Sequence, residues 1–140
     1  MSNIIIDIQS SINRDDIANQ LDAWAKLTLN KISIKKSYIE AMIVNRAEGE
    51  YYNMVFRKKP GATNVLSFPD DNNGGLIIMC DPVIDEESQY LQKQLDERYF
   101  QVFTHGILHL CGYTHDLDDD AKIMEHIEDK LFEIFKKNKS

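Results

Sequence analysis

Short apolar segments alternate with amphipathic ones along the first half of this 140-residue chain. Four segments are rich in β-branched or other apolar residues and end at polar or turn-forming residues, as strands do. They cover residues 3–9, 37–45, 64–68 and 75–81. The cluster DDNNGG, which is typical of a turn, separates the third from the fourth, so we expect these two strands to pair with each other.

Apolar residues at helical spacing mark the other segments. Residues 14–30 carry acidic residues in the first turn and one apolar face, which predicts an amphipathic helix. That face consists of Ile17, Leu21, Trp24 and Ala25. A short helix is also expected at about residues 49–56.

From Asp85 onward the pattern is helical. One apolar stripe predicts a buried helix that runs to about Cys111. The stripe consists of Leu95, Tyr99, Val102, Phe103, Gly106 and Leu110. A second amphipathic helix, over residues 119–137, closes the chain. Its predicted apolar face consists of Ile123, Ile127, Leu131 and Phe135.

These elements predict an α+β fold, because the strands lie early and helices dominate later. We expect residues 1–140 to form one domain, in which about five helices pack against a sheet of about four strands. The composition, 43% hydrophobic and 28% charged, suits one ordinary core. The N-terminal run of three isoleucines is too short for a signal peptide, and GLIIMC at residues 75–80 is too short to span a bilayer. A cytoplasmic protein that does not bind membranes is therefore expected.

The net charge of −7 argues against general nucleic-acid binding, because phosphate backbones favour basic surfaces. The charges are unevenly distributed, however. Acidic residues crowd 81–97 and 116–129, whereas RKK at residues 57–59 is basic and leaves room for a local basic patch. The two cysteines, Cys80 and Cys111, form no CxxC pair, so reduced thiols are expected.

Three of the four histidines lie within eleven positions, at His105, His109 and His115. Residues four apart on a helix share a face, so His105 and His109 can converge on one metal ion. Gly112 can adopt a left-handed conformation, which lets the chain turn back and bring in His115 as a third ligand. A metal site at the end of a buried helix is therefore predicted. Each histidine taken alone could instead be a hydrogen-bonded core residue.

Three neutral imidazoles suit zinc best, while nickel or copper would bind the same donors. Three protein ligands leave a fourth position for water, which is typical of catalytic sites. Cys111 is turned about 200° from His109 on the helix, so we expect it to point away from the metal. His126 lacks neighbouring ligands and is expected at the surface or in packing contacts.

The spacing HxxxHxxGxxH also matches the metzincin proteases, in which a glutamate after the first histidine is the general base. Gly106 occupies that position here, so peptide hydrolysis is disfavoured. Zinc can still acidify a bound water, and hydrolysis as a class stays open. Gly106 is a poor helix former, and we expect it to let the helix approach a strand closely.

HGILHLCGYTH at residues 105–115 resembles the motif H-G-x-L-H-L-x-G-Y-D-H of the YbeY-type ribosome-maturation endoribonucleases. TNVLSFP at residues 63–69 is similar to the family's T-D-V-L-S-F-P, and MEHIEDKL at residues 124–131 is similar to its M-E-x-x-E-x-x-L ending. The chain departs from the family at Thr114 and Asn64, each of which stands where the family usually has aspartate. Asp116 is the candidate for supplying the carboxylate that Thr114 lacks.

The resemblance implies a single-strand-specific, metal-dependent endoribonuclease that acts in 16S rRNA 3′-end maturation and in ribosome quality control. It also places the family's arginine at Arg57, whose planar guanidinium suits phosphate. We therefore expect zinc held by His105, His109 and His115, with Arg57 as the catalytic residue that steadies the phosphate. Ribosomal RNA, the small ribosomal subunit and ribosome-associated proteins are the expected partners.

Two other interpretations stay open. The chain could be a zinc-stabilised ribosome-assembly factor without catalysis, which the net charge of −7 favours because partner proteins would then supply the affinity for RNA. It could also be a zinc hydrolase of small substrates or peptides. Cleavage of single-stranded RNA, or its absence under any metal, separates these interpretations.

Overall fold

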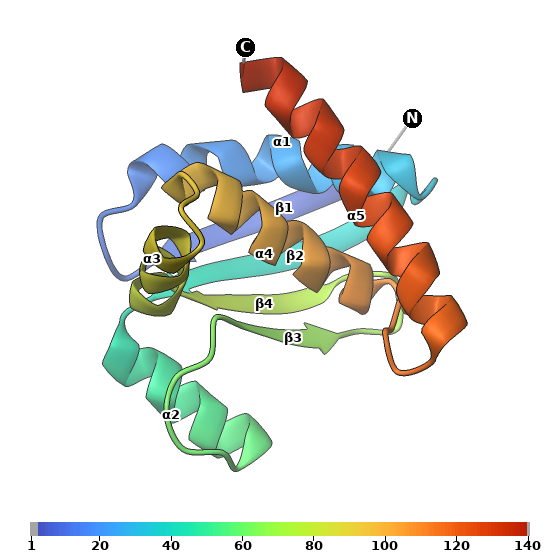
Figure 1. The fold of residues 1–140 in the computed structure, drawn as a ribbon. Coiled ribbons are helices and arrows are strands. Elements are labelled where there is room, and N and C mark those ends of the chain that lie inside the picture. Colours follow the sequence, from blue (N-terminus) through green and yellow to red (C-terminus); the bar gives the residue numbers. More distant parts are fainter. Residues whose placement is uncertain (1–2, 140) are drawn as a thin grey trace.

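The sheet brings together strands that are far apart in the sequence. The computed structural model describes residues 3–139, so Met1, Ser2 and Ser140 of the expected domain lie outside the described residues. The strands are β1 (Asn3–Ser10), β2 (Lys36–Val44), β3 (Val65–Pro69) and β4 (Gly75–Cys80). Their spatial order is β1-β2-β4-β3, with β1, β2 and β4 parallel and β3 antiparallel to β4 at the edge (Figure 1). The pairing expected across the DDNNGG turn is confirmed.

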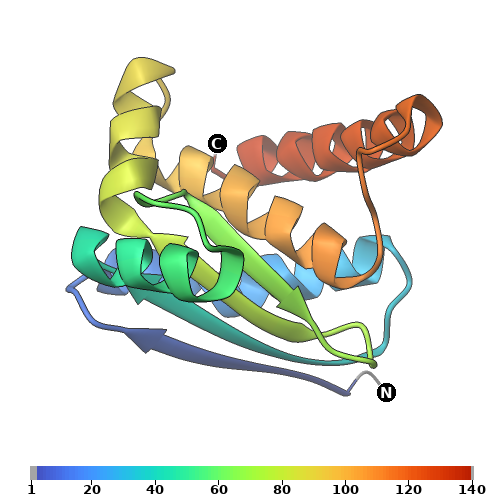
Figure 2. The ribbon, with the colours of Figure 1, turned by 90° about the horizontal axis from the view of Figure 1, so that it is seen from below.

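Side chains that alternate along β4 contribute to two apolar layers, one on each face of the sheet. Ile77 and Met79 belong to the larger layer, which α1 (Asp15–Lys31), α4 (Leu95–Leu110) and α5 (Asp118–Lys139) complete. Ile78 and Cys80 belong to a smaller layer, against which Tyr52 of α2 packs. Figure 2 shows α2 in front of the sheet and α1 behind it. The α+β fold of one domain, with four strands and five helices within residues 3–139, is as predicted.

The apolar faces predicted for α1 and α4 are buried. In α1 the predicted face is fully accounted for, with Ile17, Leu21, Trp24 and Ala25 all in the core. In α4 the stripe from Tyr99 to Leu110 is buried, while Leu95 packs at the edge of the same cluster. Within the described part of the chain, none of the helices combines the length and the apolar character needed to cross a bilayer.

Helix α2 (Arg46–Arg57) begins three residues before the predicted short helix because its first turn is capped. The side chain of Asn45 accepts a hydrogen bond of 2.8 Å from the N–H of Glu48, and the carboxylate of Glu48 accepts one of 3.2 Å from the N–H of Asn45. This reciprocal pair is a capping box, which satisfies backbone donors that a helix start leaves free.

Helix α3 (Asp81–Tyr90) also begins earlier than predicted. The sequence pattern assigns Asp81 to the strand and starts the helix at Asp85. In the structure Pro82 lies in the first turn, where its missing N–H costs nothing and its fixed φ suits the helix. A break at residues 91–94 then separates α3 from α4, and Gln92 has a φ of 57° there.

The buried face of α5 differs from the prediction at its first member. Ile123 is 53% exposed, whereas the next residue, Met124, is 1% exposed. Met124 lies three residues before Ile127, so it continues the stripe formed by Ile127, Leu131 and Phe135 on the core side. The prediction of a core position for Ile123 was therefore wrong, while the other three positions are confirmed.

Candidate metal centre and cleft

Helix α4 presents two imidazoles on one face near its C-terminal end. His105 and His109 lie one turn apart, and their Nε2 atoms are 2.9 Å from each other. The ring centroid of His115, in the loop after α4, lies 5.2 Å from that of His109 and 5.6 Å from that of His105. One ring nitrogen from each residue lies within 4.8 Å of the other two. The three histidines can therefore bind one metal ion.

The return of His115 towards the helix depends on the turn that ends α4. Gly112 has a φ of 92°, in the left-handed region that favours glycine. Its N–H donates to the carbonyl of His109 at 3.1 Å, and the N–H of Tyr113 donates to the carbonyl of Leu108 at 3.0 Å. Together these bonds form a Schellman motif. The predicted role of Gly112 is confirmed.

Gly106 lets α4 approach the sheet closely, as predicted. A Cβ atom at this position would lie 3.0 Å from Oγ of Ser67 on β3 and 3.4 Å from Cδ1 of Ile77 on β4. A larger side chain would push the helix away from both strands. The close packing therefore holds His105, the residue before Gly106, near the edge strand of the sheet.

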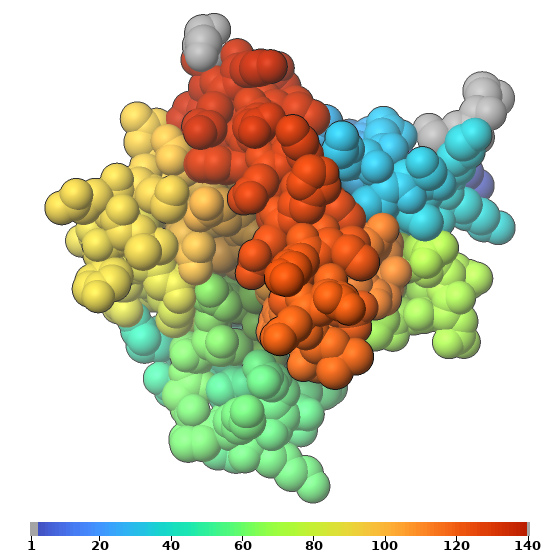
Figure 3. Space-filling view, turned by 45° about the vertical axis from the view of Figure 1, so that its right-hand side comes forward, coloured from blue at the N-terminus to red at the C-terminus, as the bar shows by residue number. Residues whose placement is uncertain are grey.

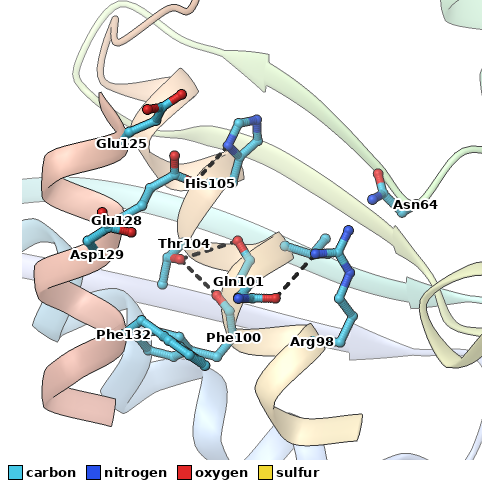
Figure 4. Close-up of a pocket in the computed structure, with 11 residues that line it drawn as sticks. Asn64, Arg98, Phe100, Gln101, Thr104, His105, Glu125, Glu128, Asp129 and Phe132 are labelled. Carbon is cyan, nitrogen blue, oxygen red and sulfur yellow. Dashed lines mark hydrogen bonds and ion pairs between the residues drawn. The ribbon is translucent and has the colours of Figure 1, made fainter. Parts of the chain in front are cut away.

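Both α4 histidines have a hydrogen-bond partner at Nδ1. In His105 this atom lies 2.9 Å from Oε2 of Glu128 on α5 (Figure 4), and in His109 it lies 2.9 Å from the carbonyl oxygen of Tyr113. Because a carbonyl oxygen only accepts, His109 donates from Nδ1, and its Nε2 is left to bind a metal. Partners of this kind orient metal-binding imidazoles and make them better donors.

The protonation of His109 also suits metal binding. Burial lowers the pKa of this imidazole, and the neighbouring His105 lowers it further. The neutral form, which a metal requires, is therefore favoured at neutral pH.

Other candidates near the cluster do not join it. The Cys111 thiol donates to the carbonyl of Asn73 at 3.4 Å, which agrees with the expectation that it points away. His126 is exposed on α5, as expected of a surface residue. Glu128, rather than Asp116, supplies the carboxylate that contacts a histidine of the cluster. The suggestion that Asp116 compensates for Thr114 is therefore unsupported.

A cleft of about 510 Å³ lies against the three histidines. Residues 63–68, which include most of β3, form one wall. Arg57, at the C-terminal end of α2, lines the same cleft. The structure thus brings the predicted guanidinium and the three predicted ligands to one cleft, although they come from separate parts of the chain.

Asn64, one of the two departures from the family motif, forms hydrogen bonds with a neighbouring carboxylate. Its Nδ2 donates to both carboxylate oxygens of Glu87, at 3.1 and 3.3 Å. Arg98 pairs with the same carboxylate at 3.1 Å. An aspartate at position 64 would lack the amide donor and would place a second negative charge beside Glu87. The asparagine therefore fits its surroundings in this chain.

A second hollow, of about 400 Å³, adjoins the cleft and is lined mainly by residues of α4 and α5. Asn64 and His105 line both spaces. The wall that α5 contributes to the second hollow is acidic (Figure 4), and its charged residues are Glu125, Glu128 and Asp129. The histidine cluster therefore has an acidic side towards α5 and a basic residue, Arg57, on the side of α2.

Glu128 is the site residue that the sequence reasoning missed. Its segment, MEHIEDKL, is visible in the sequence only as a resemblance to a family ending. The glutamate itself gives no sign of its partner, because α5 and α4 meet only in the tertiary structure. The 3.6-residue pattern places Glu128 beside the buried Leu131 and Met124, at the border of the packed face.

Comparison with known proteins agrees with these features. The family described as "Endoribonuclease YbeY" matches residues 4–136. The protein named Endoribonuclease YbeY from Nitrosomonas europaea is 38% identical over 133 residues, which cover 91% of this chain and 79% of that protein. The protein of the same name from Coxiella burnetii is 32% identical over 139 residues, with 91% of each chain covered.

A solved structure shares the fold. The solution structure of TM1509 from Thermotoga maritima has a TM-score of 0.71 and 25% sequence identity, and the match covers 92% of this chain and 87% of that one. The sequence and structural matches both extend over nearly the whole chain, and the matched range includes the three histidines and Arg57. The chain belongs to the YbeY endoribonuclease family.

Proposed function

We propose that the protein is a single-strand-specific, zinc-dependent endoribonuclease that hydrolyses RNA phosphodiester bonds in the cleft beside His105, His109 and His115. Its proposed role is 16S rRNA 3′-end maturation and ribosome quality control in the cytoplasm. The observation that carries the proposal is the convergence of three histidine nitrogens, within 4.8 Å of one another, in a cleft that Arg57 also lines. The names of the relatives support RNA as the substrate.

The donor set fits zinc. Nitrogen ligands from three histidines, two of them held at Nδ1 by Glu128 and Tyr113, are the set that catalytic zinc sites use. Nickel or copper would bind the same donors. We propose zinc because its ligand preference matches three imidazoles and because it is widely used in proteins. When bound, zinc supplies Lewis-acid chemistry that stabilises negative charge on phosphate oxygens and acidifies water.

The protein's own groups would position the RNA. Arg57 would hold the phosphate through its planar guanidinium, which matches the geometry of two phosphate oxygens and favours the charge that grows on them during cleavage. The strand β3 would confine the nucleotide on the opposite side, because residues 63–68 form that wall. The cleft therefore combines three imidazole donors with the positive charge of Arg57.

The expected partners are ribosomal RNA, the small ribosomal subunit and proteins associated with it. The net charge of −7 means that affinity for RNA has to come from a local surface or from such proteins. A non-catalytic, zinc-stabilised assembly factor is the second candidate, because the same charge favours binding through proteins. A hydrolase of peptides or small molecules is the third, and turnover of a peptide library without RNA cleavage would support it.

The test combines elemental analysis of the purified protein with cleavage of a single-stranded RNA, with and without a chelator. We expect zinc near one equivalent, cleavage that the chelator abolishes, and no cleavage of the duplex form of the same RNA. His109→Ala should lose both the metal and the cleavage. RNA cleavage that survives in metal-free His109→Ala protein would contradict the role of the metal.

The proposed role of Arg57 has a matched control on the same helix. Arg57→Glu should lower kcat/KM for RNA by roughly a hundredfold to a thousandfold, the usual effect of removing a group that stabilises transition-state charge. Arg46→Glu makes the same charge change at the other end of α2 and should have a small effect. Ribosome association that persists in Arg57→Glu would support the enzyme, whereas a wild-type protein inactive with every metal would support the assembly factor.

A further inference from the structure

The exposed face of α2 carries a concentration of apolar side chains. Of the ten large hydrophobic residues exposed among residues 3–139, four lie on this helix of 12 residues. They are Tyr51, Met54, Val55 and Phe56. Tyr51 is 62% exposed and Phe56 is 53% exposed. Apolar side chains gathered in this way mark binding surfaces more often than scattered ones do.

Aromatic rings connect this face to the cleft. The ring centroid of Phe56 lies 4.9 Å from that of Phe68, which lines the cleft beside the histidines. On its other side, Phe56 stacks with Tyr52 at 6.0 Å and an interplanar angle of 13°. Tyr52 in turn contacts Tyr51 at 5.4 Å. An aromatic row therefore leads from the cleft along α2, with Phe56 and Tyr51 as its most exposed members.

The charge near this row is opposite to that of the whole protein. Residues 45–59 contain four basic and two acidic side chains, although the net charge of the chain is −7. Three of the four basic residues, Arg57, Lys58 and Lys59, are consecutive at the end of α2 next to the cleft. In the space-filling view, the segment from α2 to β3, in green, forms the lower end of the molecule (Figure 3).

The opposite side of the cleft is unsuited to a phosphate backbone. There α5 contributes Glu125, Glu128 and Asp129 to the adjoining hollow, and the one lining arginine, Arg98, is already paired with Glu87. A polyanion that leaves the cleft would be repelled on this side and attracted on the side of α2.

We infer that the exposed face of α2, with Phe56 and Tyr51 as stacking rings and Lys58 and Lys59 as phosphate contacts, binds the nucleotides of single-stranded RNA on one side of the scissile bond. This inference rests on the proposed function. Stacking of unpaired bases on aromatic side chains, beside basic residues that track the backbone, is how proteins bind single strands without reading sequence. The platform would also exclude duplexes, whose bases are not free to stack.

RNA suits this face better than a docked protein does because the aromatic row continues into the cleft and three consecutive basic residues follow Phe56 at the cleft end of the row. A protein that occupied the same face would have to reach the edge of the cleft at Phe68. Its affinity would depend on the apolar area of the α2 side chains rather than on their aromatic rings, so substitutions that keep apolar area but remove a ring distinguish the two partners.

The first experiment measures binding of a labelled single-stranded RNA of about 12 nucleotides, a length within the range that such surfaces cover. The full chain is used in the presence of a chelator, so that binding is separated from cleavage. Phe56→Ala should raise Kd by roughly 5- to 150-fold, whereas Phe56→Tyr should bind nearly as well as wild type. Phe56→Leu keeps apolar area and should bind weakly. Tyr90→Ala, on the exposed end of α3, is the matched control and should not change Kd.

The second experiment tests the two lysines through salt dependence. Lys58→Gly and Lys59→Gln should each reduce the slope of log Kd against log salt concentration by about 0.7, the value for one single-strand phosphate contact. Lys58 has a φ of 56°, which glycine adopts readily, so Lys58→Gly should remain folded, as thermal unfolding will verify. Lys137→Gln removes the same charge from the far end of α5 and should leave the slope unchanged.

Cleavage by the zinc-loaded protein completes the test. Phe56→Ala should raise KM and leave kcat within about twofold of wild type, since a remote binding contact acts on affinity. Equal Kd values for wild type, Phe56→Ala and Tyr90→Ala would overturn the inference and leave the face to a protein partner. That result is distinct from failure of the proposed function, in which the zinc-loaded wild type does not cleave RNA at all.

Discussion

Glu128 contacts the histidine cluster without being one of its three histidines. Its carboxylate lies 2.9 Å from Nδ1 of His105 and thereby fixes which ring nitrogen faces the other two imidazoles. The cluster therefore depends on a side chain from another helix, and the rotamer of His105 is set by tertiary structure.

We predict that Glu128→Gln weakens zinc binding by about ten- to hundredfold, the usual effect of removing a charged partner of a metal-binding histidine. The glutamine keeps the shape but loses the negative charge. Competition with a fluorescent chelator measures the affinity. Asp129→Asn, one residue along on the same helix, removes a charge that contacts none of the three histidines and should bind zinc as wild type does. If both variants bind zinc with wild-type affinity, the carboxylate has no role at the metal.

The two thiols should be slow to react in the folded protein. Burial, together with the charge of Asp70, raises the pKa of Cys111 to about 11, and burial raises the pKa of Cys80 as well. Since only the thiolate reacts, raising the pKa from about 9 to about 11 lowers the reactive fraction at pH 8 by roughly a hundredfold, and reactivity returns as the pH rises towards 11. Titration with a disulfide reagent should show slow reaction in buffer and two rapid equivalents in urea. Rapid reaction of Cys111 in the native protein would contradict the raised pKa of this thiol.

The sequence was sufficient to identify the three histidines, because their residue type and spacing indicate metal binding without knowledge of the fold. Histidines at i and i+4, followed by a glycine and a third histidine, predict a metal site because helix geometry alone brings the first two together. Glu128 could not be paired with His105 in the same way, because the chain between them contains a turn and a loop whose path depends on the packing of α5. Asn64 likewise looks in the sequence like the loss of the family's aspartate. Only its hydrogen bond to Glu87 in the folded structure explains the asparagine.

Among the elements, the turn after α4 couples backbone conformation to the histidine cluster. Gly112 is in the left-handed region, and a Cβ atom added there would meet nothing within 4 Å. Replacing Gly112 by another residue would therefore strain the backbone without causing a steric clash.

Gly112→Ala should lower the free energy of unfolding by about 1–2 kcal/mol, the cost of holding an alanine in the left-handed region. It should also weaken zinc binding, because His115 follows the turn. Gly61→Ala is a matched control, since Gly61 has a φ of 81° and equally free space, yet lies in a loop without a ligand. Urea unfolding and zinc titration of both variants should show similar stability losses but weaker binding only for Gly112→Ala. Equal zinc affinities would show that the turn does not position His115.

Element boundaries were predictable where a local signal marks them. The capping box at Asn45 and the proline at position 82 are such signals, and they mark the starts of α2 and α3. The break between α3 and α4 has no comparable marker, because a glutamine rather than a glycine takes the positive φ at position 92. On α5, Ile123 and Met124 are both apolar, and only packing against α4 decides which is buried.

For the whole molecule, the strand order β1-β2-β4-β3 was beyond the reach of local patterns. The antiparallel pair β3–β4 follows from a short turn, but the placement of β2 against β4 depends on the helices that cover the parallel strands. This order matters for function because it puts β3 at the edge, where it can form a wall of the cleft.

Binding of metal should stabilise the entire fold, since α4, the loop after it and, through Glu128, α5 all meet at the histidines. Zinc at about a hundred times its Kd should add about 2.7 kcal/mol to the free energy of unfolding. For a domain of this size, that corresponds to a rise in Tm of roughly 5–15 °C. Thermal unfolding with zinc and with chelator measures the difference, and His109→Ala should abolish it. A Tm unchanged by zinc in the wild type would contradict a metal site formed by the native structure.

The contact between Glu128 and His105 has a consequence for the order in which the protein becomes competent during synthesis. A nascent chain that has reached residue 115 already holds all three histidines and Arg57, yet it lacks the carboxylate that orients the first of them. That carboxylate arrives only with α5, the last helix of the described chain. A chain that has not yet completed α5 is therefore expected to bind the metal more weakly than the folded protein, as the Glu128→Gln variant is.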